Sequence, residues 1–493
     1  MNTLLVTAAL LAQSNPIREW RQANERPILT EFTELVRLPN LASDRPNIRR
    51  NGQLIRDMLL KRGVDTKLLE IDNAPPVVFG EIRTPGALRT IIFYAHYDGQ
   101  PVDPKQWSTP PWEPVMRTAS VDNGGKIVNW RNEAKLDPEW RLFARAVADD
   151  KAPIMAMLSA LDAMKATSRQ HRSNIKFFFE GEEEVGSPHL EQFARKYKDL
   201  LAGDVWLICD GPVHQNRRQS LAFGVRGVTG ADITIYGPRR ELHSGHYGNW
   251  APNPAMMLSR LLATMTDGEG RVMIDGFYDG IIALTAREKE AINAAPQLDA
   301  QLKEELGIFR ADGNDGRLLD LINQPSLNIR GLESASVSTG ARNVVPAQAT
   351  ASLDLRLVKG IDHKAQIARL VAHLKNQGYF VIQNEPTAAE RRRYAKLARV
   401  KADGGYNAVR TSMDLPICRD VIGAVAAVHG PPVLLPTHGG SVPLWVFEEV
   451  LRTPLILVPT VNHDNNQHSH NENLRLQNLW DGIETMAALL AMP

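Results

Sequence analysis

The chain has 493 residues, which is too long for one compact core and suggests roughly two to four domains. Its 57 basic and 56 acidic side chains leave a formal net charge of +1, which argues against the clustered positive charge of a nucleic-acid-binding protein. Only two cysteines are present, Cys209 and Cys418, so the sequence offers neither a disulfide framework nor a cysteine-rich zinc site. No apolar run reaches the roughly 20 residues of a membrane-spanning helix.

The first segment that needs interpretation is Leu4 to Ala12, which is apolar except for Thr7. It has the length of a signal-peptide core and ends on a small residue suited to cleavage, although a positively charged start is missing. The alternative is a frayed beginning of the first helix. The pattern of that helix begins only near Pro16, so the sequence leans towards export and leaves the compartment open.

Helical and strand patterns alternate along the first half of the chain. Helices are expected over 17–38, 51–61 and 153–164, the last opened by Pro153. Buried strands are expected over 77–79, 90–94, 174–179 and 205–209. This alternation predicts an α/β layer with a mostly parallel sheet, in which ligands collect at the carboxyl ends of the strands.

Near Gly224 the pattern changes to a smaller α+β unit. Alternating strands are expected over 231–236, 347–357 and 379–382, with helices over 254–265 and 362–376 and a polar insertion over 267–324. From about Ser412 the βα pattern resumes, with a helix over 421–428, strands over 433–435 and 455–458, and a last helix ending near Leu490. The sequence therefore predicts a discontinuous large domain, residues 1–223 and 409–493, with a smaller domain, residues 224–408, inserted into it.

Acidic and histidine side chains cluster at five places, most of them directly after a predicted strand. They are His96-Tyr97-Asp98, Asp149-Asp150-Lys151, Glu180-Gly181-Glu182-Glu183-Glu184, Asp210, and a late loop with His463, His468 and His470. Each alone has an ordinary interpretation: a structural histidine, a helix cap, a solvated charge run, a turn residue or a polar loop. Together, however, unpaired carboxylates and histidines cannot share a low-dielectric cleft without compensation.

A pair of divalent metal ions bridged by one carboxylate would supply this compensation, with the ions about 3.5–4 Å apart. Zn²⁺ accepts both imidazole and carboxylate ligands and keeps one position for water in catalytic sites. Mn²⁺ and Co²⁺ tolerate the same ligand set. The sequence therefore predicts two divalent metal ions per subunit, with zinc as the first choice.

The order of these clusters resembles that of the M20 family of dinuclear metallopeptidases, and most closely its carnosinase-like dipeptidase branch. Three further motifs match: His243-Ser244-Gly245, Gly340-Ala341-Arg342-Asn343-Val344-Val345-Pro346 and Gly439-Gly440-Ser441-Val442-Pro443. The motifs follow the family order from about residue 28 to the C-terminus, so the resemblance covers almost the whole chain. It implies that the large domain is catalytic and that the inserted α+β domain is a lid and dimerisation domain.

The resemblance also implies a ligand set and a general base. Five residues would hold the metals: Asp149 between the two ions, His96 and Asp210 on one of them, and Glu184 and His468 on the other. Asp98 would orient His96. Glu183 would take a proton from the metal-bound water and later deliver it to the leaving amine.

Further implied roles concern the substrate. His243 would reach in from the lid of a neighbouring subunit to stabilise the oxyanion. Four residues would hold the terminal carboxylate of the substrate: Arg342, Asn343, Gly440 and Ser441.

Several of these roles have alternatives. Asp98 could cap a turn, His243 could be a hinge residue, and Arg342 could form an ion pair within the lid. In the late loop, His463 or His470 could take the place of His468.

The sequence also departs from the family pattern. Ala144, Ala146 and Ala152 stand where the family has glycines around the bridging aspartate, which is followed by a cis peptide in family members, and alanine tolerates fewer backbone conformations. Thr437-His438 precedes the late Gly-Gly-Ser where carnosinase-like members have an acidic residue. The segment from Trp107 to Trp140 is longer than usual and could reshape the rim of the pocket.

The sequence thus predicts that a homodimer hydrolyses the peptide bond of dipeptides or short peptides by a metal-bridging hydroxide. The same site would serve an N-acyl-amino-acid amidohydrolase of the deacylase or desuccinylase type, because no residue identifies an acceptor for a free α-amine. A remote interpretation is a non-catalytic binding protein on the same fold. The complete ligand set and the retained Glu183 argue against it. The side-chain preference and the physiological metal stay open.

Overall fold

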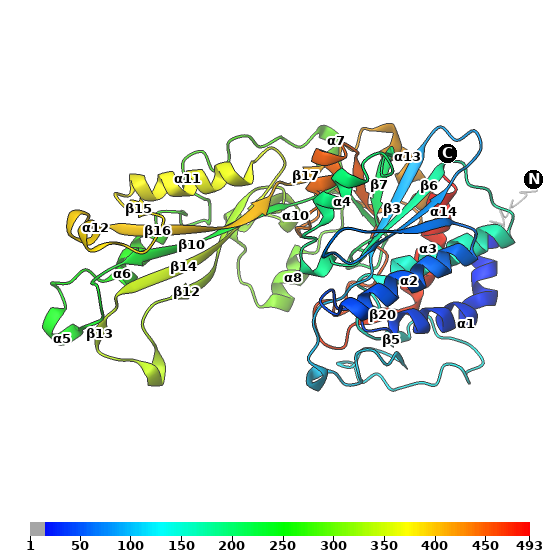
Figure 1. Ribbon diagram of the computed structural model, residues 1–493, viewed down its shortest axis with the longest axis horizontal. Coiled ribbons are helices and arrows are strands. Elements are labelled where there is room, and N and C mark those ends of the chain that lie inside the picture. Colours follow the sequence, from blue (N-terminus) through cyan, green and yellow to red (C-terminus); the bar gives the residue numbers. More distant parts are fainter. Residues whose placement is uncertain (1–14) are drawn as a thin grey trace, which may run out of the picture. The chain divides into compact units, whose positions relative to one another are not determined.

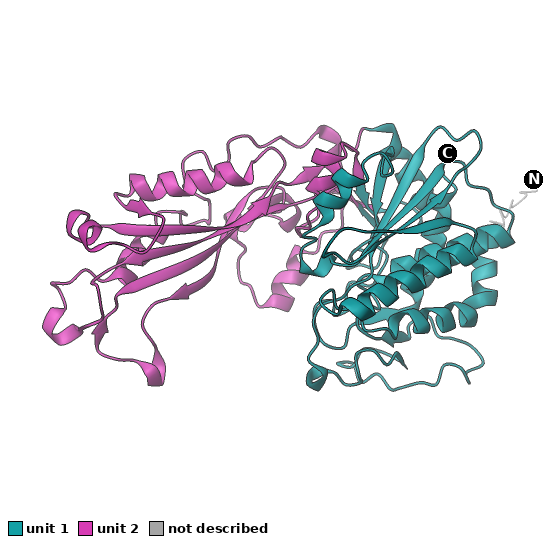
Figure 2. Cartoon of the chain, in the orientation of Figure 1, with its two compact units in different colours: residues 1–221, 415–432, 456–493 teal, residues 222–414, 433–455 magenta. Residues whose placement is uncertain are grey.

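The computed structural model describes residues 15–493, which fold into two compact units (Figures 1 and 2). Unit 1 extends to Leu221 and includes Leu415–Pro432 and Ile456–Pro493. Unit 2 comprises Ala222–Asp414 and Val433–Leu455. The segment from Leu4 to Ala12, interpreted above as a signal-peptide core, lies outside the described residues. Within residues 15–493, no helix has the length and apolar character needed to cross a membrane.

The larger sheet has eight strands in the order β1-β2-β6-β3-β7-β19-β8-β18. Their bounds are β1 Asp65–Leu69, β2 Val77–Ile82, β3 Thr90–His96, β6 Asn174–Glu180, β7 Val205–Ile208, β8 Ser220–Ala222, β18 Val433–Leu435 and β19 Leu455–Leu457. β3 is parallel to both β6 and β7, whereas β2 is antiparallel to β1 and to β6. The predicted α/β class is confirmed, with a sheet that is mixed at its β1 edge.

The strands that carry the site are almost completely buried. β3, β6 and β7 are buried at every position after the first residue of β3 and β6 and have mainly apolar side chains, as is typical of strands covered on both faces. His96 ends β3 and Glu180 ends β6, and the two residues are partners in the strand register. The polar residues that follow these strands are therefore delivered to one edge of the sheet.

Helix α3 (Lys151–Ala166) packs against both α1 (Pro16–Val36) and α14 (Leu476–Leu490), and nearly all of its side chains are buried. It begins two residues before Pro153, because proline is tolerated in the first turn of a helix. Helix α2 (Arg45–Lys61) also begins earlier than expected, since the Asp44 side chain accepts the N–H of Asn47 and caps it.

Further helices and a small sheet complete unit 1. The helices are α4 (Leu190–Lys196), α13 (Pro416–His429) and two short 3₁₀ turns, η1 (Pro104–Gln106) and η2 (Glu183–Val185). The small sheet joins β4 (Val115–Arg117), β5 (Arg141–Phe143) and β20 (Asn473–Arg475). It connects the segments before Asp149 and after His468, the two candidate ligands that follow no strand of the large sheet.

Unit 2 is built on a five-stranded sheet in the order β12-β14-β10-β16-β15. Their bounds are β10 Gly227–Tyr236, β12 Ser326–Glu333, β14 Gln348–Leu357, β15 Phe380–Ile382 and β16 Leu397–Tyr406. β14 buries every second side chain, as its sequence predicts, and these side chains pack with α6 (Pro254–Leu262) and α11 (His363–Asn376). The result is the α+β arrangement expected for the smaller part.

The other elements of unit 2 are short. The helices are α5 (Ser244–Tyr247), α7 (Ala286–Ala294), α8 (Asp299–Leu306), α9 (Asp312–Asp315), α10 (Leu318–Leu321), α12 (Ala388–Arg393), the 3₁₀ turn η3 (Ser338–Gly340) and the π-helix η4 (Val446–Val450). The two-stranded pairs are β9 (Gly224–Val225) with β17 (Val409–Arg410) and β11 (Leu242–His243) with β13 (Val344–Val345).

Candidate active site

Two groups of side chains in unit 1 have the composition and spacing of metal-ligand sets. The first is His96, Asp149 and Asp210, and the second is Asp149, Glu184 and His468. Within each group the ligand atoms all lie within 4.8 Å of one another. The structure thus brings together the five predicted ligands, with Asp149 common to both groups. His463 and His470 belong to neither group.

The sheet explains how distant residues converge. His96 ends β3, Asp210 follows β7, and Glu184 lies in the turn η2 after β6. Because these three strands are parallel neighbours, their carboxyl ends meet at one edge, where ligands of open α/β sheets bind. Asp149 precedes α3, and His468 lies in the loop before β20.

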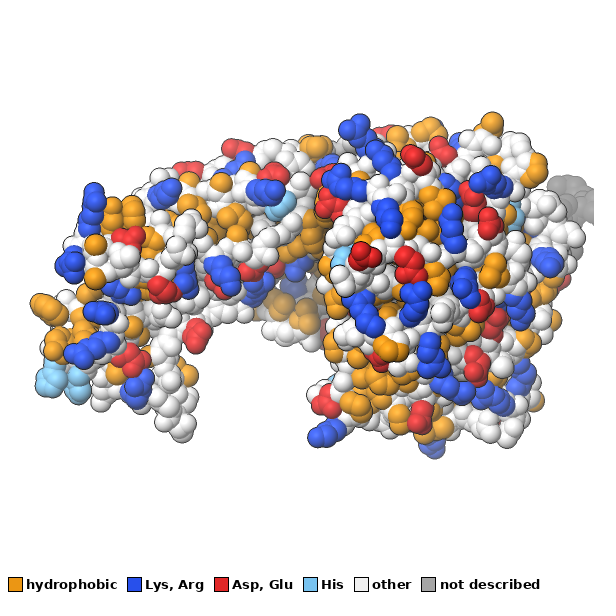
Figure 3. Space-filling model, viewed as in Figure 1, with side chains coloured by type: hydrophobic (Ala, Val, Ile, Leu, Met, Phe, Trp, Pro, Cys, Tyr) orange, Lys and Arg blue, Asp and Glu red, His pale blue; other side chains and the backbone are white. Residues whose placement is uncertain are grey.

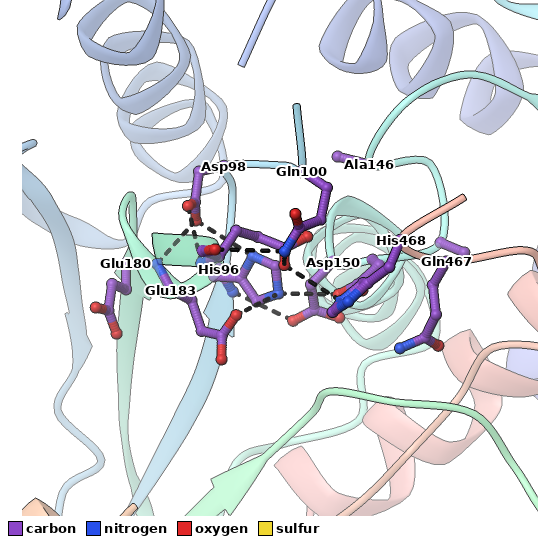
Figure 4. A network of polar contacts seen from close by, with 12 residues as sticks. His96, Asp98, Gln100, Ala146, Asp150, Glu180, Glu183, Gln467 and His468 are labelled. Atoms are coloured by element: carbon purple, nitrogen blue, oxygen red, sulfur yellow. Dashed lines mark hydrogen bonds and ion pairs between the residues drawn. The ribbon is translucent and has the colours of Figure 1, made fainter. Parts of the chain in front are cut away.

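Asp149 lies between the two histidines. Its Oδ1 is 3.0 Å from Nε2 of His96, and its Oδ2 is 3.1 Å from Nε2 of His468. Nε2 of His468 also lies 3.2 Å from Oε2 of Glu184. Figure 4 shows Glu183 and His468 on either side of the His96 imidazole. One carboxylate therefore faces two separate nitrogen donors, as a metal-bridging ligand would.

Burial and neighbouring charges shift the pKa values of the carboxylates in this cluster. Burial raises the pKa of Glu183 well above its ordinary value, that of Glu184 to about 8, and that of Asp210 to about 6. Burial also acts on Asp149, but its contacts with His468 and His96 hold its pKa below the ordinary value. The hydrogen bond to Asp149 raises the pKa of His468 to about 8. The cluster holds more negative charge than its histidines offset.

Asp98 contacts both sides of the site. Its Oδ1 lies 3.3 Å from Nδ1 of His96, close enough for an ionic contact although the two atoms are not aligned as a hydrogen bond. Its two oxygens also accept the backbone N–H groups of Glu183 and Glu184, each at 3.1 Å. Asp98 therefore faces the His96 ring and caps the turn at the same time, so the two interpretations of this residue are compatible.

Three residues at the site had no role predicted from the sequence. Gln100 donates to Oε2 of Glu184 at 2.8 Å, and Asp150 accepts the backbone N–H of His96 at 3.2 Å. Gln100 had a signal, because residues 96, 98 and 100 alternate on one side of an extended chain. Glu472 accepts the backbone N–H of Asp149 at 3.0 Å, and nothing in its local sequence indicated this contact. The peptide bond between Asp149 and Asp150 is cis, as the family pattern implied.

The predicted substrate residues of unit 2 fall into two separate groups. In the first, β11 pairs with β13, and the backbone N–H of Ser244 donates to the carbonyl of Asn343 at 2.9 Å. This places His243, Arg342 and Asn343 together, and all three are exposed. Figure 1 shows α5 and β13 at one end of unit 2, and Figure 3 shows histidine and basic side chains on the surface there. Arg342 forms an ion pair with Glu241 at 2.7 Å, which is the alternative that the sequence left open.

The second group contains Gly440 and Ser441. Oγ of Ser441 accepts a hydrogen bond from Arg356 at 2.8 Å, and the carbonyl of Gly440 accepts the backbone N–H of Arg226 at 3.1 Å. Arg356 lies near the end of β14, whereas β13 leads into the beginning of β14 at Gln348. Eight residues of extended strand span about 26 Å. One chain therefore does not bring the two halves of the predicted carboxylate site together.

The chain is similar over nearly its whole length to known peptidases. It is 26% identical to the Cys-Gly metallodipeptidase DUG1 of Saccharomyces cerevisiae, covering 94% of each chain. It is also 26% identical to the human Beta-Ala-His dipeptidase, covering 96% of this chain and 88% of that protein. The solved M20 family metallo-carboxypeptidase Sso-CP2 of Sulfolobus solfataricus matches with a TM-score of 0.76 and 26% identity, covering 94% and 98% of the two chains.

A sequence profile of Peptidase family M20/M25/M40 matches residues 92–492, which include all five candidate ligands and both groups of candidate substrate residues. The predicted resemblance to a metallopeptidase family is therefore confirmed, and the chain belongs to peptidase family M20/M25/M40.

Proposed function

We propose that this protein is a metal-dependent dipeptidase that hydrolyses the peptide bond of dipeptides or short peptides. The observation that carries the proposal is the pair of ligand groups that share Asp149. The relatives named Cys-Gly metallodipeptidase and Beta-Ala-His dipeptidase support the same class of substrate.

The side chains present fit two divalent cations. Each group combines imidazole nitrogen with carboxylate oxygen, a donor set that suits zinc and is also accepted by manganese and cobalt. The raised pKa values of Glu184 and Asp210 reflect buried negative charge that a cation would offset. We propose zinc as the resident metal. When bound, such ions polarise the substrate carbonyl and make water a stronger acid.

Glu183 is our proposed general base. Its Oε2 lies 3.8 Å from Nε2 of His96, beside the ligand groups but in neither of them. Its backbone is held by Asp98, and its burial raises its pKa, which suits a carboxylate that takes up a proton and returns it. Glu183 would accept the proton of the attacking water and pass it to the nitrogen of the leaving amine.

The residues of unit 2 would act across a homodimer. His243 accepts the N–H of Gly245 on Nδ1 at 3.1 Å, so a neutral ring carries its proton on Nε2, where it can donate to an oxyanion. Because Arg342 and Ser441 lie at opposite ends of the sheet of one chain, a carboxylate held by both would need groups from two protomers. This supports the proposal that His243, Arg342 and Asn343 serve the partner's site.

An exposed sheet edge in unit 2 supports such a homodimer. β12 is the edge strand of the five-stranded sheet, and most of its residues are exposed, including Ile329 and Leu332. Two apolar side chains of unit 2 outside this strand, Trp250 and Val337, are each 79% exposed. Unpaired edge strands with apolar side chains commonly pair with another chain.

One observation favours a second candidate, an N-acyl-amino-acid amidohydrolase. His438 stands where carnosinase-like members have an acidic residue, and burial lowers its pKa. Its Nδ1 accepts the N–H of Gly440 at 3.2 Å. A neutral imidazole offers no negative charge to a free α-amine at this position.

A substrate panel tests the proposal. Apoprotein reloaded with Zn²⁺, Mn²⁺ or Co²⁺ is assayed with unmodified dipeptides and with their N-acetylated forms. We expect release of free amino acids from the unmodified set. Hydrolysis of the acetylated dipeptides alone would contradict the dipeptidase proposal and favour the amidohydrolase. No hydrolysis of either set with any of the three metals would contradict both proposed functions.

A further inference from the structure

The loop from Arg145 to Asp149, which presents the proposed bridging ligand, contains a backbone conformation that its sequence does not favour. Ala146 is fully buried and has φ of 59°, in the left-handed region. This is one of the positions where the family has glycine. A residue with a β-carbon loses about 1–2 kcal/mol there, so the surroundings must hold the loop in place.

The side chain of Glu472 holds this loop. Glu472 is completely buried, and its Oε2 accepts the N–H of Ala146 at 2.9 Å. Its Oε1 accepts the N–H groups of Ala148 at 2.9 Å and Asp149 at 3.0 Å. Three backbone donors thus converge on one carboxylate, in the manner of an anion-binding nest filled by the chain's own side chain.

The same contacts join this loop to the one that carries His468. Arg145 donates to Oε2 of Glu472 and to the carbonyl of Ser469, each at 2.9 Å. The ring of Trp107 lies 5.0 Å from the Arg145 guanidinium. Glu472 follows His468 by four residues, so one ion pair fixes the two loops that present Asp149 and His468.

We infer that Glu472 is a positioning residue that, together with Arg145, sets the place of Asp149 relative to His468 and thereby determines metal affinity. The inference rests on the proposed two-metal site. It goes beyond that site because Glu472 touches neither group of ligand atoms by its carboxylate but holds the backbone on which the shared ligand stands.

The expected consequence follows from the geometry. Without the carboxylate, three buried N–H groups lose their acceptor, and Ala146 is free to return to negative φ. Asp149 then no longer presents its two oxygens to His96 and His468 at once. Outer-sphere partners of metal ligands typically change affinity by about 10–100-fold when removed.

The test compares two buried glutamates of unit 1. Glu472→Gln removes the positioning carboxylate, and Glu484→Gln removes a carboxylate that is also buried and bonded to arginine, at Arg18 and Arg21. Zn²⁺ affinity is measured on the full chain by competition with a chromophoric chelator, and bound metal is counted by mass spectrometry. We expect Zn²⁺ affinity to fall about 10–100-fold in Glu472→Gln and to stay unchanged in Glu484→Gln.

Arg145→Lys keeps the test informative if Glu472→Gln does not fold, and Ala146→Gly sharpens the test if it does. Arg145→Lys keeps the charge but cannot bridge Glu472 and Ser469, so we expect a smaller loss of affinity in the same direction. Adding Ala146→Gly to the Glu472→Gln protein should recover part of the affinity, because glycine adopts positive φ without steric cost. In the wild-type background, Ala146→Gly should leave affinity unchanged.

Kinetics add a second measurement. At saturating Zn²⁺ we expect Glu472→Gln to lower kcat while KM stays near the wild-type value, because the substrate contacts are untouched. Wild-type Zn²⁺ affinity in both Glu472→Gln and Arg145→Lys, or an equal loss in Glu484→Gln, would overturn the inference. A wild-type chain that binds fewer than two ions would instead overturn the proposed function.

Discussion

The ligand cluster of unit 1 and the exposed end of unit 2 present their candidate residues in very different settings. In unit 1, His96 and Asp98 are fully buried, at the end of a covered strand. In unit 2, His243 and Arg342 are exposed, and the strands β11 and β13 that present them have two residues each.

The two sets of residues differ in how much support they receive from their own chain. The cluster in unit 1 is assembled by one chain, and its members hold one another through short contacts. The end of unit 2 has no comparable support, and Arg342 is bonded to Glu241 instead. Side chains so exposed are free to contact another molecule, as the proposed role in the partner's site requires.

The largest effect is expected from Glu183→Gln, which should lower kcat by about 10²–10⁴-fold, because it removes the proton acceptor. Bound metal should stay at the wild-type level, since Glu183 belongs to neither ligand group. Activity assays with metal analysis check this. Loss of metal along with activity would mean that Glu183 is a metal ligand and would contradict its assignment as the general base.

His243→Ala should lower kcat by about 10²–10³-fold, the range for removal of one oxyanion donor, and should leave the melting temperature unchanged because the side chain is exposed. Its role in the partner's site is tested by mixing it with Glu183→Gln. Random exchange between the two inactive homodimers should restore about a quarter of wild-type activity, through one complete site in each mixed dimer. No recovery after proven exchange would place His243 in its own chain's site.

Arg342→Ala should raise KM for dipeptides by about 10–100-fold, because a charged hydrogen bond to the carboxylate contributes about 1.5–3 kcal/mol. Dipeptide amides, which lack the carboxylate, should be affected less. Arg342→Lys is the matched control, since it keeps the charge and loses the two-point contact. An equal rise in KM for dipeptides and for dipeptide amides would show that Arg342 does not bind the substrate carboxylate. Its ion pair with Glu241 would then be purely structural.

The smallest effect is expected at Asp464, a structural residue of unit 1. Partial burial opposes its ionisation, but the hydrogen bond from Arg141 lowers its pKa to about 2. A lowered carboxyl pKa stabilises the fold above the unfolded pKa near 4, and this contribution disappears as pH falls from about 4 to about 2. Because the side chain is 38% exposed, Asp464→Asn should cost only about 1 kcal/mol at pH 7.

Denaturant unfolding of wild type and Asp464→Asn at several pH values checks this. The difference in unfolding free energy should shrink on acidification. The exposed pair of Asp315 with Lys303 provides the control, for which Asp315→Asn should give a smaller change. A difference that does not depend on pH would show that Asp464 acts through packing.

The ligand set was implied by the family resemblance, and the sheet pattern explains why three of its five members converge. His96, Glu184 and Asp210 come after buried apolar strands, and parallel strands bring their ends together. Helix starts were less predictable, since the cap of α2 at Asp44 and the first turn of α3 before Pro153 depend on single side-chain contacts and local tolerance.

The supporting contacts could not be predicted. Glu472 meets the loop at Asp149 from more than 300 residues away in sequence, and its own neighbours in the chain resemble a polar loop. The separation of Arg342 from Ser441 could not be predicted from the sequence either, because it depends on which end of β14 lies near each of the two loops. Spacing in sequence identifies side chains of the right chemistry, whereas their support depends on tertiary packing.

The length of β14 has a consequence for how such an enzyme behaves on dilution. If one protomer cannot span from Arg342 to Ser441, substrate capture becomes a property of the associated pair, and turnover per chain falls once the concentration drops below the dissociation constant of the dimer. The activity per chain would then be proportional to the fraction of chains that are dimeric. It would therefore depend on the concentration of the protein.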